Sequence, residues 1–192
     1  METIQYYSGP TDIKGMYAIY YEPHIDKRGS FEELYNIKNN YQYFENGISQ
    51  VSVSVSQMNV IRGLHFQIDK PMAKMIRVIN GYIYLFAIDI NPFSPTFKNK
   101  FISKVSETYN TAYVFPPHCA IGYLIREPTT IIQYFQNTSY NKDSSFAINI
   151  FDPELNLIIY DTKYILSDRD KNAMSLKEWI KYQHQHNLEW QV

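Results

Sequence analysis

The sequence has little cysteine and no excess of charge of either sign. Cys119 is the single cysteine among 192 residues, so neither an internal disulfide nor a cysteine-based metal site can form. This scarcity favours a reducing compartment, and we expect a cytoplasmic protein. Lys and Arg number 18 against 19 Asp and Glu, a formal net charge of -1, which lacks the basic footprint of nucleic-acid binding.

Long apolar runs are also missing. No segment approaches the roughly 18 apolar residues of a membrane span, and residues 1–10 show no basic region followed by an apolar run. We therefore expect no membrane partner. What is present, 45% hydrophobic residues, fits one soluble domain over residues 1–192, with a core of about 12–170 and a tail of 171–192.

Most of the chain has the pattern of short β-strands. Valine and serine alternate over residues 51–56, so one face of this strand is apolar and the small polar face could line a cavity. The apolar runs 72–79 and 82–90 are separated by Asn80-Gly81, the pair best suited to a type I′ turn, which predicts a hairpin. Further strands are expected at 16–21, 111–115, 122–125, 129–135 and 146–150.

Prolines mark the breaks between these strands. The number and spacing of the short strands predict an all-β fold of the jelly-roll barrel or β-sandwich type. Only the C-terminal tail has a helical pattern. Ser175 and Glu178 have the spacing of a capping box, and Leu176 and Trp179 begin an apolar side. We expect this short helical tail to pack on the barrel.

The segment from Val60 to Gln67 carries the strongest chemical signal, because it contains Arg62 and His65 and is followed by Lys74. A histidine and a lysine on neighbouring strands, with a nearby arginine, are what a site needs to take a proton from a carbon beside a carbonyl in an anionic substrate. A lone strand histidine is more often structural, and Lys74 could point outward. Its phase relative to Met72 and Ile76 favours the inward direction.

A barrel that contains histidines can also bind a metal, but such sites need two or three histidines and a carboxylate at close spacing. Gln67 stands where the second histidine of a pair would be expected, and His118 is far away in the sequence. His184 and His186 lie in a polar tail where solvent exposure is expected, and His24 is expected in a loop. We therefore expect neither a metal nor a cofactor.

From about residue 12 to 170, the chain resembles the dTDP-4-dehydrorhamnose 3,5-epimerase family of nucleotide-sugar epimerases in several sequence blocks that follow one another in the same order. The blocks that carry the resemblance are Asp26-Lys27-Arg28-Gly29-Ser30-Phe31-Glu32-Glu33, Gln50 with the serine ladder, Arg62-Gly63-Leu64-His65-Phe66-Gln67, Lys74-Met75-Ile76-Arg77-Val78, Asp89 with Ser94-Pro95-Thr96-Phe97, Ala120 and Gly122, Tyr134, Asp152-Pro153-Glu154-Leu155, and Leu166-Ser167 with Asp170.

This resemblance implies a metal-free cupin barrel, usually a homodimer, that inverts the carbons flanking the C4 ketone of a nucleotide-linked 4-keto-6-deoxy sugar. It implies His65 as the base, Lys74 as the cation that stabilises the enolate, and Tyr134 as the acid on the opposite face. Asp170 would orient the His65 imidazole, although its neighbour Asp168 is an alternative and either could instead cap a helix.

The same matching implies that the diphosphate is bound by Arg28 and Arg62, whose planar donors suit phosphate oxygens. The nucleotide or the sugar would be contacted by Phe31, Glu33, Gln50 and Tyr140. Glu33 can reach the site from the partner subunit, because the N-terminal strands of the family often cross between subunits.

The chain departs from the family pattern at four places. Ile121 replaces a histidine, Ser52 an asparagine, Phe135 a lysine, and Ile150-Phe151 stands where a tryptophan is usual. These changes leave open which nucleotide is bound and whether C3, C5 or both are inverted. A single-centre epimerase, a 3,4-ketoisomerase, a non-catalytic sugar-binding cupin and a metal-dependent oxygenase are the alternative hypotheses.

Overall fold

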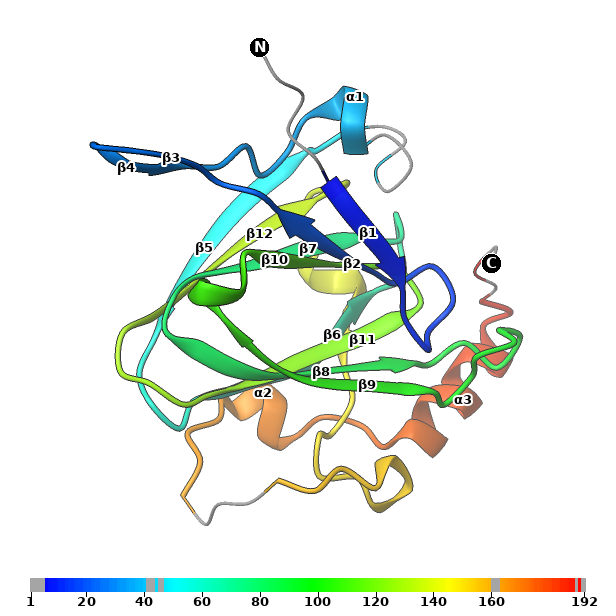
Figure 1. The fold of residues 1–192 in the computed structure, drawn as a ribbon. Coiled ribbons are helices and arrows are strands. Elements are labelled where there is room, and N and C mark those ends of the chain that lie inside the picture. Colours follow the sequence, from blue (N-terminus) through cyan, green and yellow to red (C-terminus); the bar gives the residue numbers. More distant parts are fainter. Residues whose placement is uncertain (1–5, 41–43, 45–46, 160–162, 189, 191–192) are drawn as a thin grey trace.

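Two antiparallel sheets face each other and enclose the core in the computed structural model, which describes residues 6–40, 44, 47–159, 163–188 and 190 (Figure 1). The six-stranded sheet has the order β1-β2-β10-β7-β12-β5, and the five-stranded sheet has the order β13-β6-β11-β8-β9. Strands that follow one another in sequence commonly lie in different sheets. This arrangement confirms the all-β jelly-roll architecture predicted from the sequence.

The six-stranded sheet contains β1 (Tyr6–Pro10), β2 (Tyr17–Tyr21), β5 (Gln50–Ser56), β7 (Lys74–Asn80), β10 (Thr111–Phe115) and β12 (Thr130–Gln136). The five-stranded sheet contains β6 (Ile61–Gln67), β8 (Tyr82–Asp89), β9 (Lys100–Ser106), β11 (Cys119–Ile125) and β13 (Ser145–Ala147). The remaining elements are the hairpin strands β3 (His24–Asp26) and β4 (Gly29–Phe31), the helices α1 (Ile37–Asn40), α2 (Asp168–Lys171) and α3 (Leu176–Gln185), and the 3₁₀ turns η1 (Glu107–Tyr109), η2 (Lys142–Ser144) and η3 (Pro153–Leu155).

The predicted Asn80-Gly81 hairpin is wrong. Strand β7 pairs with β10 and β12, whereas β8 pairs with β9 and β11, so the two residues connect one sheet to the other. A type I′ turn needs a positive φ at both central residues, and of this pair only Gly81 has one (83°). Glycine is required there because a Cβ would lie 2.5 Å from Thr130 Oγ1.

Several elements were not predicted from the sequence, among them β1, β9 and the β3–β4 hairpin. Strand β9 is an edge strand whose sequence, Lys-Phe-Ile-Ser-Lys-Val-Ser, is too polar for a clear apolar run. Strands β3 and β4 form a two-stranded hairpin that projects from the barrel; His24 lies in this hairpin and not in a loop (Figure 1).

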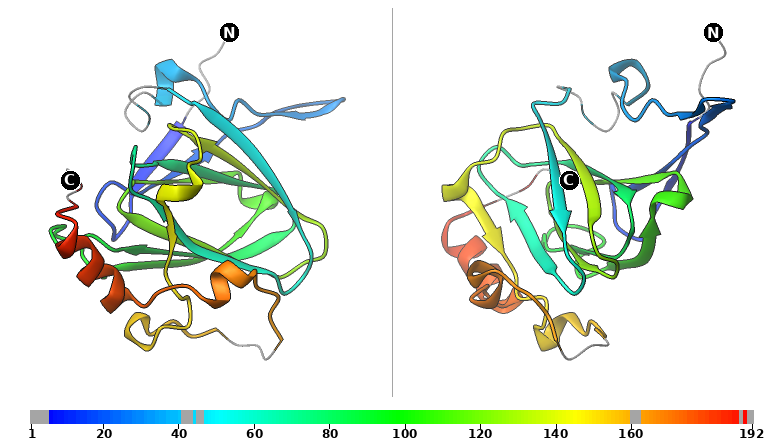
Figure 2. Two further views of the ribbon diagram at one scale, coloured as in Figure 1. Left: turned by 180° about the vertical axis from the view of Figure 1, so that it is seen from behind. Right: turned by 90° about the vertical axis from the view of Figure 1, so that its left-hand side faces the viewer.

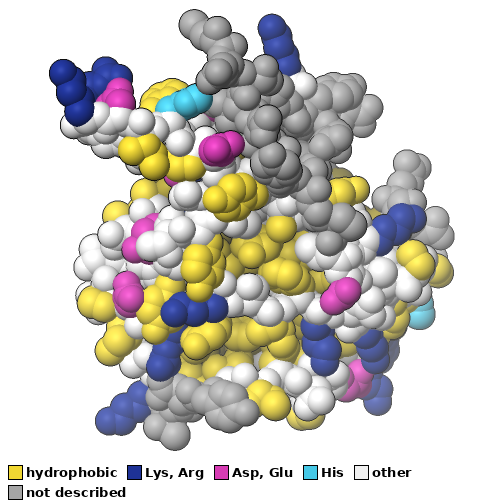
Figure 3. Space-filling view, in the orientation of Figure 1, with side chains coloured by type: hydrophobic (Ala, Val, Ile, Leu, Met, Phe, Trp, Pro, Cys, Tyr) yellow, Lys and Arg dark blue, Asp and Glu magenta, His cyan; other side chains and the backbone are white. Residues whose placement is uncertain are grey.

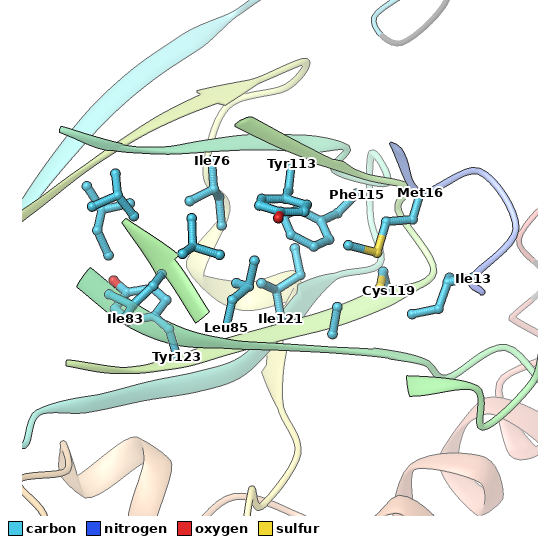
Figure 4. Packing of buried hydrophobic residues seen from close by; sticks show 14 of the residues in the cluster. Ile13, Met16, Ile76, Ile83, Leu85, Tyr113, Phe115, Cys119, Ile121 and Tyr123 are labelled. Carbon is cyan, nitrogen blue, oxygen red and sulfur yellow. The ribbon is translucent and has the colours of Figure 1, made fainter. Parts of the chain in front are cut away.

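The main hydrophobic core fills the space between the sheets. Ile76 and Tyr113 from the six-stranded sheet face Leu85 and Ile121 from the five-stranded sheet (Figure 4). A second cluster lies outside the five-stranded sheet, where Trp179 of α3 packs edge-on against Phe66 with ring centroids 4.6 Å apart. The barrel is therefore covered on this outer face by the C-terminal segment.

Helix α3 begins with the predicted capping box. The Ser175 side chain accepts a hydrogen bond from the Glu178 amide, and the Glu178 carboxylate accepts one from the Ser175 amide. Helices α2 and α3 lie against the barrel at the end away from the β3–β4 hairpin (Figure 2). None of the described helices is long and apolar enough to cross a membrane.

Candidate active site

A cavity of about 320 Å³ opens between the two sheets. Both sheets contribute to its wall, and the segments after β12 and around α2 form its rim. The lining residues include Gln50, Ser52, Ser54, Arg62, His65, Gln67, Met72, Lys74, Ile76, Ile121, Tyr123, Tyr134, Tyr140 and Arg169. The polar face of the serine ladder on β5 therefore lines a cavity, as the sequence suggested.

A bulge in β6 brings Arg62 and His65 to the same cavity. Side chains three residues apart point to opposite faces of a regular strand. Here His65 pairs with Ile121 and Arg62 with Tyr123, so β6 has one more residue than β11 in this interval. Gly63 takes up the extra length with a φ of 113°, and a Cβ on it would lie 2.4 Å from the Gly122 Cα. The Arg-Gly-Leu-His sequence therefore places both functional side chains inward.

His65 is held by Asp170, from a distant part of the chain. The His65 Nε2 and Asp170 Oδ1 atoms are 2.5 Å apart, and the Asp170 side chain is only 3% exposed. Burial alone would raise the pKa of Asp170, but the hydrogen bond and charge of His65, with help from Ser167, lower it below the usual carboxyl value. The buried carboxylate fixes one ring nitrogen, so the other is the one available for chemistry.

The same geometry decides whether Asp168 or Asp170 is the partner of His65. The cap of α2 is Ser167, whose hydroxyl accepts from the Asp170 amide. The Asp168 carboxylate is exposed and pairs with Lys171 at 3.1 Å. The structure thus places Asp170, and not Asp168, against His65.

Lys74 points into the cavity from β7, as its phase with Met72 and Ile76 predicted. It does not lie on a strand paired with that of His65, because β6 and β7 belong to facing sheets. Burial, and then the nearby charge of Arg169, lower the pKa of Lys74 to about 8. Within the described residues no carboxylate is paired with its ammonium. The charge is therefore available to an anionic group in the cavity.

Tyr134 reaches the cavity from β12, in the sheet that faces His65. Its phenol oxygen lies 2.9 Å from Ser54 Oγ and shares a hydrogen bond with the phenol of Tyr123. Burial, and then a negative charge on Tyr123 when that phenol is the ionised one, raise the pKa of Tyr134, so it is protonated at neutral pH. A neutral phenol and a carboxylate-held imidazole therefore project into one cavity from opposite sheets.

Three of the predicted binding residues lie at the cavity. Arg62 donates to Ser56 Oγ at 3.2 Å, and the Gln50 side chain accepts from the Tyr140 amide at 2.8 Å. Sequence reasoning missed Arg169, which lines the same rim and donates to Ser145 Oγ at 2.9 Å. Its position next to Asp170 on the first turn of α2 was the available signal. It missed Tyr123 too, one tyrosine among eighteen.

The other three predicted binding residues do not reach this cavity. Arg28 and Phe31 lie on the β3–β4 hairpin, and Glu33 follows it. Arg28 is 84% exposed and pairs with Asp26, two residues earlier, while Phe31 is 67% exposed. The hairpin stands out from the body of the molecule with basic side chains at its tip (Figure 3). We call residues 24–33 the arm.

Only two of the four departures from the family pattern face the cavity. Ile121 and Ser52 line it, and Ile121 lies directly opposite His65 in the strand register. Phe135 packs away from the cavity against Tyr35, and Ile150 is buried in the cluster under α3. Of these four changes, only Ile121 and Ser52 can therefore alter contacts to a bound ligand in this chain.

The remaining histidines and the cysteine are separate from the cavity. His118 is buried near Asp89, with Nε2 3.2 Å from the Lys14 carbonyl, and His184 and His186 are exposed. Burial raises the pKa of the Cys119 thiol well above its usual range, which makes it inert as a nucleophile. Among the described residues, no group of three potential ligands is placed to hold a metal ion.

A model of the family described as dTDP-4-dehydrorhamnose 3,5-epimerase matches residues 10–178. The chain belongs to this family. A relative of that name from Methanothermobacter thermautotrophicus is 30% identical over 175 residues, covering 88% of this chain and 93% of the relative. A dTDP-4-dehydro-6-deoxyglucose 3-epimerase from a Streptomyces species is 28% identical over 171 residues, covering 87% of each.

The fold of a family member of known structure is closely similar. The dTDP-6-deoxy-D-glucose-3,5-epimerase of Legionella pneumophila, solved in complex with dTDP-4-keto-L-rhamnose, superimposes with a TM-score of 0.85 at 26% identity. The match covers 90% of this chain and 94% of that one. The resemblance inferred from sequence blocks is thus confirmed over most of the chain.

Proposed function

We propose that this protein is a nucleotide-diphospho-4-keto-6-deoxysugar epimerase that inverts C3, C5 or both through an enolate, in deoxysugar biosynthesis. One observation carries the proposal. His65, fixed by Asp170, projects from one sheet into the cavity, and Lys74 and Tyr134 project into it from the facing sheet. This is the constellation needed to remove a proton from one face of a sugar ring and return one to the other.

His65 acts as the base. A proton beside a ketone is too weakly acidic for a side-chain base unless the developing enolate oxygen is stabilised. The Lys74 ammonium supplies that charge, since its side chain projects into the cavity wall from β7 and is partly shielded from solvent. The Asp170 carboxylate holds the imidazole in orientation and stabilises the imidazolium that forms when His65 takes the proton.

Tyr134 acts as the acid. Its phenol remains protonated at neutral pH, and an enolate carbon is basic enough to take the proton despite the weak acidity of the phenol. Because Tyr134 belongs to the sheet opposite His65, it delivers the proton to the opposite face of the ring. The new C–H bond then has inverted configuration.

The diphosphate lies at the rim of the cavity. Arg62 and Arg169 present two guanidinium groups there, and such planar donors match phosphate oxygens. Gln50 and Tyr140, which are linked through the Tyr140 amide, contact the nucleotide or the sugar beside them. The nucleoside then extends out of the cavity toward solvent.

The arm completes the site of a partner in a homodimer. Arg28 and Phe31 have the chemistry to bind a phosphate and stack on a base, yet in their own chain they face solvent. Val53 and Val55 on the outer side of edge strand β5 are also 61% exposed, an apolar strip that a second copy can cover. Exchange of arms across a two-fold axis brings Arg28, Phe31 and Glu33 to the neighbouring cavity.

Inversion at a single carbon is the second candidate, favoured by Ile121. This apolar side chain faces the cavity directly across from His65, where the family pattern has a histidine. The sugar hydroxyl that such a histidine would bind loses a partner, which weakens one of the two orientations that double inversion requires. The location proposed for either enzyme is the cytoplasm, with which the buried free thiol of Cys119 is compatible.

The test is deuterium incorporation. The purified protein is incubated in deuterium oxide with dTDP-4-keto-6-deoxyglucose, and deuterium at C3 and C5 is followed by NMR and mass spectrometry. Incorporation with inversion at both carbons identifies a 3,5-epimerase, and at one carbon a single-centre enzyme. Exchange that occurs only with a sugar linked to another nucleotide would show that the enzyme is specific for that nucleotide. No exchange with any nucleotide 4-ketosugar would sink the enzymatic proposal in favour of a sugar-binding cupin.

Mixing two variants tests the exchanged arms. His65→Asn lacks the base, and Arg28→Ala/Phe31→Ala lacks the arm contacts. If arms act across the dimer, a refolded one-to-one mixture assayed well below KM regains unmodified activity in about a quarter of its sites, because half of the dimers are hybrids with one complete site. Activity no greater than the average of the two variants would place each arm at its own cavity.

A further inference from the structure

The hydroxyl of Tyr123 is hydrogen-bonded to the phenol oxygen of Tyr134, the proposed acid. Tyr123 lies on β11 of the five-stranded sheet, whereas Tyr134 lies on β12 of the facing sheet. Their phenol oxygens share a hydrogen bond that bridges the two sheets. Ser54 Oγ on β5 lies 3.3 Å from the Tyr123 oxygen and 2.9 Å from the Tyr134 oxygen. Three hydroxyls thus meet at the cavity wall.

Tyr123 differs from a tyrosine that is merely buried. The hydroxyl of the core residue Tyr21 donates to the Leu34 carbonyl at 2.9 Å, a usual way to satisfy a buried phenol. The Tyr123 hydroxyl instead contacts Ser54 and Tyr134, which both line the cavity. A hydroxyl can donate or accept, so this cluster has no fixed direction. Tyr123 can therefore become the donor when Tyr134 has given up its proton.

The reprotonation step creates a need for such a donor. When Tyr134 protonates the enolate carbon, its O–H bond breaks, a C–H bond forms, and the electron pair stays on the Tyr134 oxygen as a phenolate. Burial raises the pKa of Tyr134, which means that this phenolate is costly in its site. Burial raises the pKa of both phenols; the charge of Arg62 opposes this rise, but it acts from outside the hydroxyl cluster.

We propose that Tyr123 is a positioning residue for the acid: it orients the Tyr134 hydroxyl across the cavity and donates its own O–H to the phenolate formed during inversion. This inference rests on the proposed epimerase function and deepens it. The Tyr123 proton stays on its own oxygen throughout. After each turnover the His65 imidazolium releases its proton to solvent and the Tyr134 phenolate takes one up from solvent, so protons balance over the cycle.

The position of Tyr123 on β11 links its hydroxyl to proton delivery by Tyr134 and not to proton abstraction by His65. Ile121, two residues earlier, points into the same interior and lies opposite His65 (Figure 4). Strand β11 therefore offers an apolar side chain to the base and a hydroxyl to the acid. Loss of the Tyr123 hydroxyl should impair proton delivery more than proton abstraction.

In deuterium oxide, the Tyr123→Phe variant distinguishes an effect on proton delivery from an effect on proton abstraction. Abstraction by His65 with return to the same face exchanges hydrogen without inversion, whereas inversion requires Tyr134. The ratio of exchange to inversion should rise about tenfold in Tyr123→Phe, the loss expected for one hydrogen bond to a charged acceptor. In the opposite direction, 3-fluorotyrosine at position 123 is a stronger donor and should lower the ratio below that of the unmodified protein.

Tyr113→Phe is the matched control, because Tyr113 is another largely buried phenol of the same core cluster but does not line the cavity. It should keep the original ratio. A purely structural role for Tyr123 would lower exchange and inversion by the same factor. An unchanged ratio in Tyr123→Phe beside a raised ratio in Tyr134→Phe would overturn the inference and leave the epimerase function standing. Absence of exchange in the unmodified protein would overturn both.

Discussion

In the cavity, His65 contacts Asp170 at 2.5 Å, and both side chains are held by strands or helices that pack on the core. On the arm, Arg28 pairs with its close neighbour Asp26, and its side chain is 84% exposed. The same family pattern contributes residues to both regions. In the proposed function, the chain therefore builds its acid–base chemistry internally, while the arm residues Arg28, Phe31 and Glu33 act at the cavity of a second copy.

The arm is nevertheless fixed to the barrel at its base. Glu32 pairs with Arg77 at 2.9 Å, and the Arg77 guanidinium is buried beneath it, where it also donates to the Asn110 side chain. A buried guanidinium needs such a partner, because an unpaired charge in the interior is costly. The pair holds the root of the arm while its tip remains exposed. The arm is thus an anchored projection from the barrel.

The largest effect is expected from the base. His65→Asn should lower both deuterium exchange and inversion by about 10²–10⁴-fold, because general base catalysis contributes that much. The nucleotide should still bind with nearly unchanged affinity, since the rim and the arm are intact; calorimetry with dTDP measures this. Substantial exchange in His65→Asn would mean that another group abstracts the proton.

The second-largest effect is expected from removal of the Lys74 charge. Lys74→Met should lower kcat by about 10²–10³-fold, the usual loss of one group that stabilises an oxyanion. The pH dependence gives a second readout. Lys74 carries its charge below its pKa of about 8, so kcat should fall as pH rises through that value. Arg169→Gln removes the charge that lowers this pKa and should move the fall to higher pH; a fall at unchanged pH would assign it to another group.

A smaller effect is expected on the arm. Arg28→Ala should raise KM about tenfold with little change in kcat, since the arginine contributes binding that is equal in the ground and transition states. Lys27→Ala, a change of the neighbouring residue on the same arm, should leave KM near its original value. A kcat loss comparable to that of Lys74→Met would instead place Arg28 among the residues that act on the reacting carbons.

The smallest effect is expected at the root of the arm. Glu32→Gln keeps the size of the side chain but removes its charge from Arg77, and should lower the free energy of unfolding by about 1 kcal/mol, as followed by urea denaturation. Glu154→Gln breaks the exposed pair with Lys98 and should cause no measurable change. Equal effects of the two substitutions would contradict the view that Glu32 anchors the arm.

Much of the cavity could be predicted from the sequence, because its signals are local. Alternation along β5 and the phase of Lys74 indicated which side chains face inward, and Asn80-Gly81 correctly marked a break between strands. The partner of each strand was not predictable. The turn pair suggested a hairpin, but the choice of sheet depends on packing across the barrel, which a short motif does not encode.

The bulge in β6 and the contact of Tyr123 with Tyr134 were not predictable from the sequence either. Regular alternation would have put Arg62 and His65 on opposite faces, and only the close approach of Gly63 to Gly122 brings both inward. Tyr123 had no distinguishing feature among eighteen tyrosines until β11 and β12 were placed on facing sheets. Contacts between sheets need the three-dimensional structure.

The most direct test of the account is the stereochemical outcome of Tyr134→Phe in deuterium oxide with the sugar nucleotide that the unmodified enzyme inverts. His65 and Tyr134 are assigned to opposite faces of the ring, so the variant should still incorporate deuterium beside the ketone while the configuration at that carbon is retained. Inversion at the original rate, or loss of exchange as complete as in His65→Asn, would contradict the division of the reaction between the two sheets.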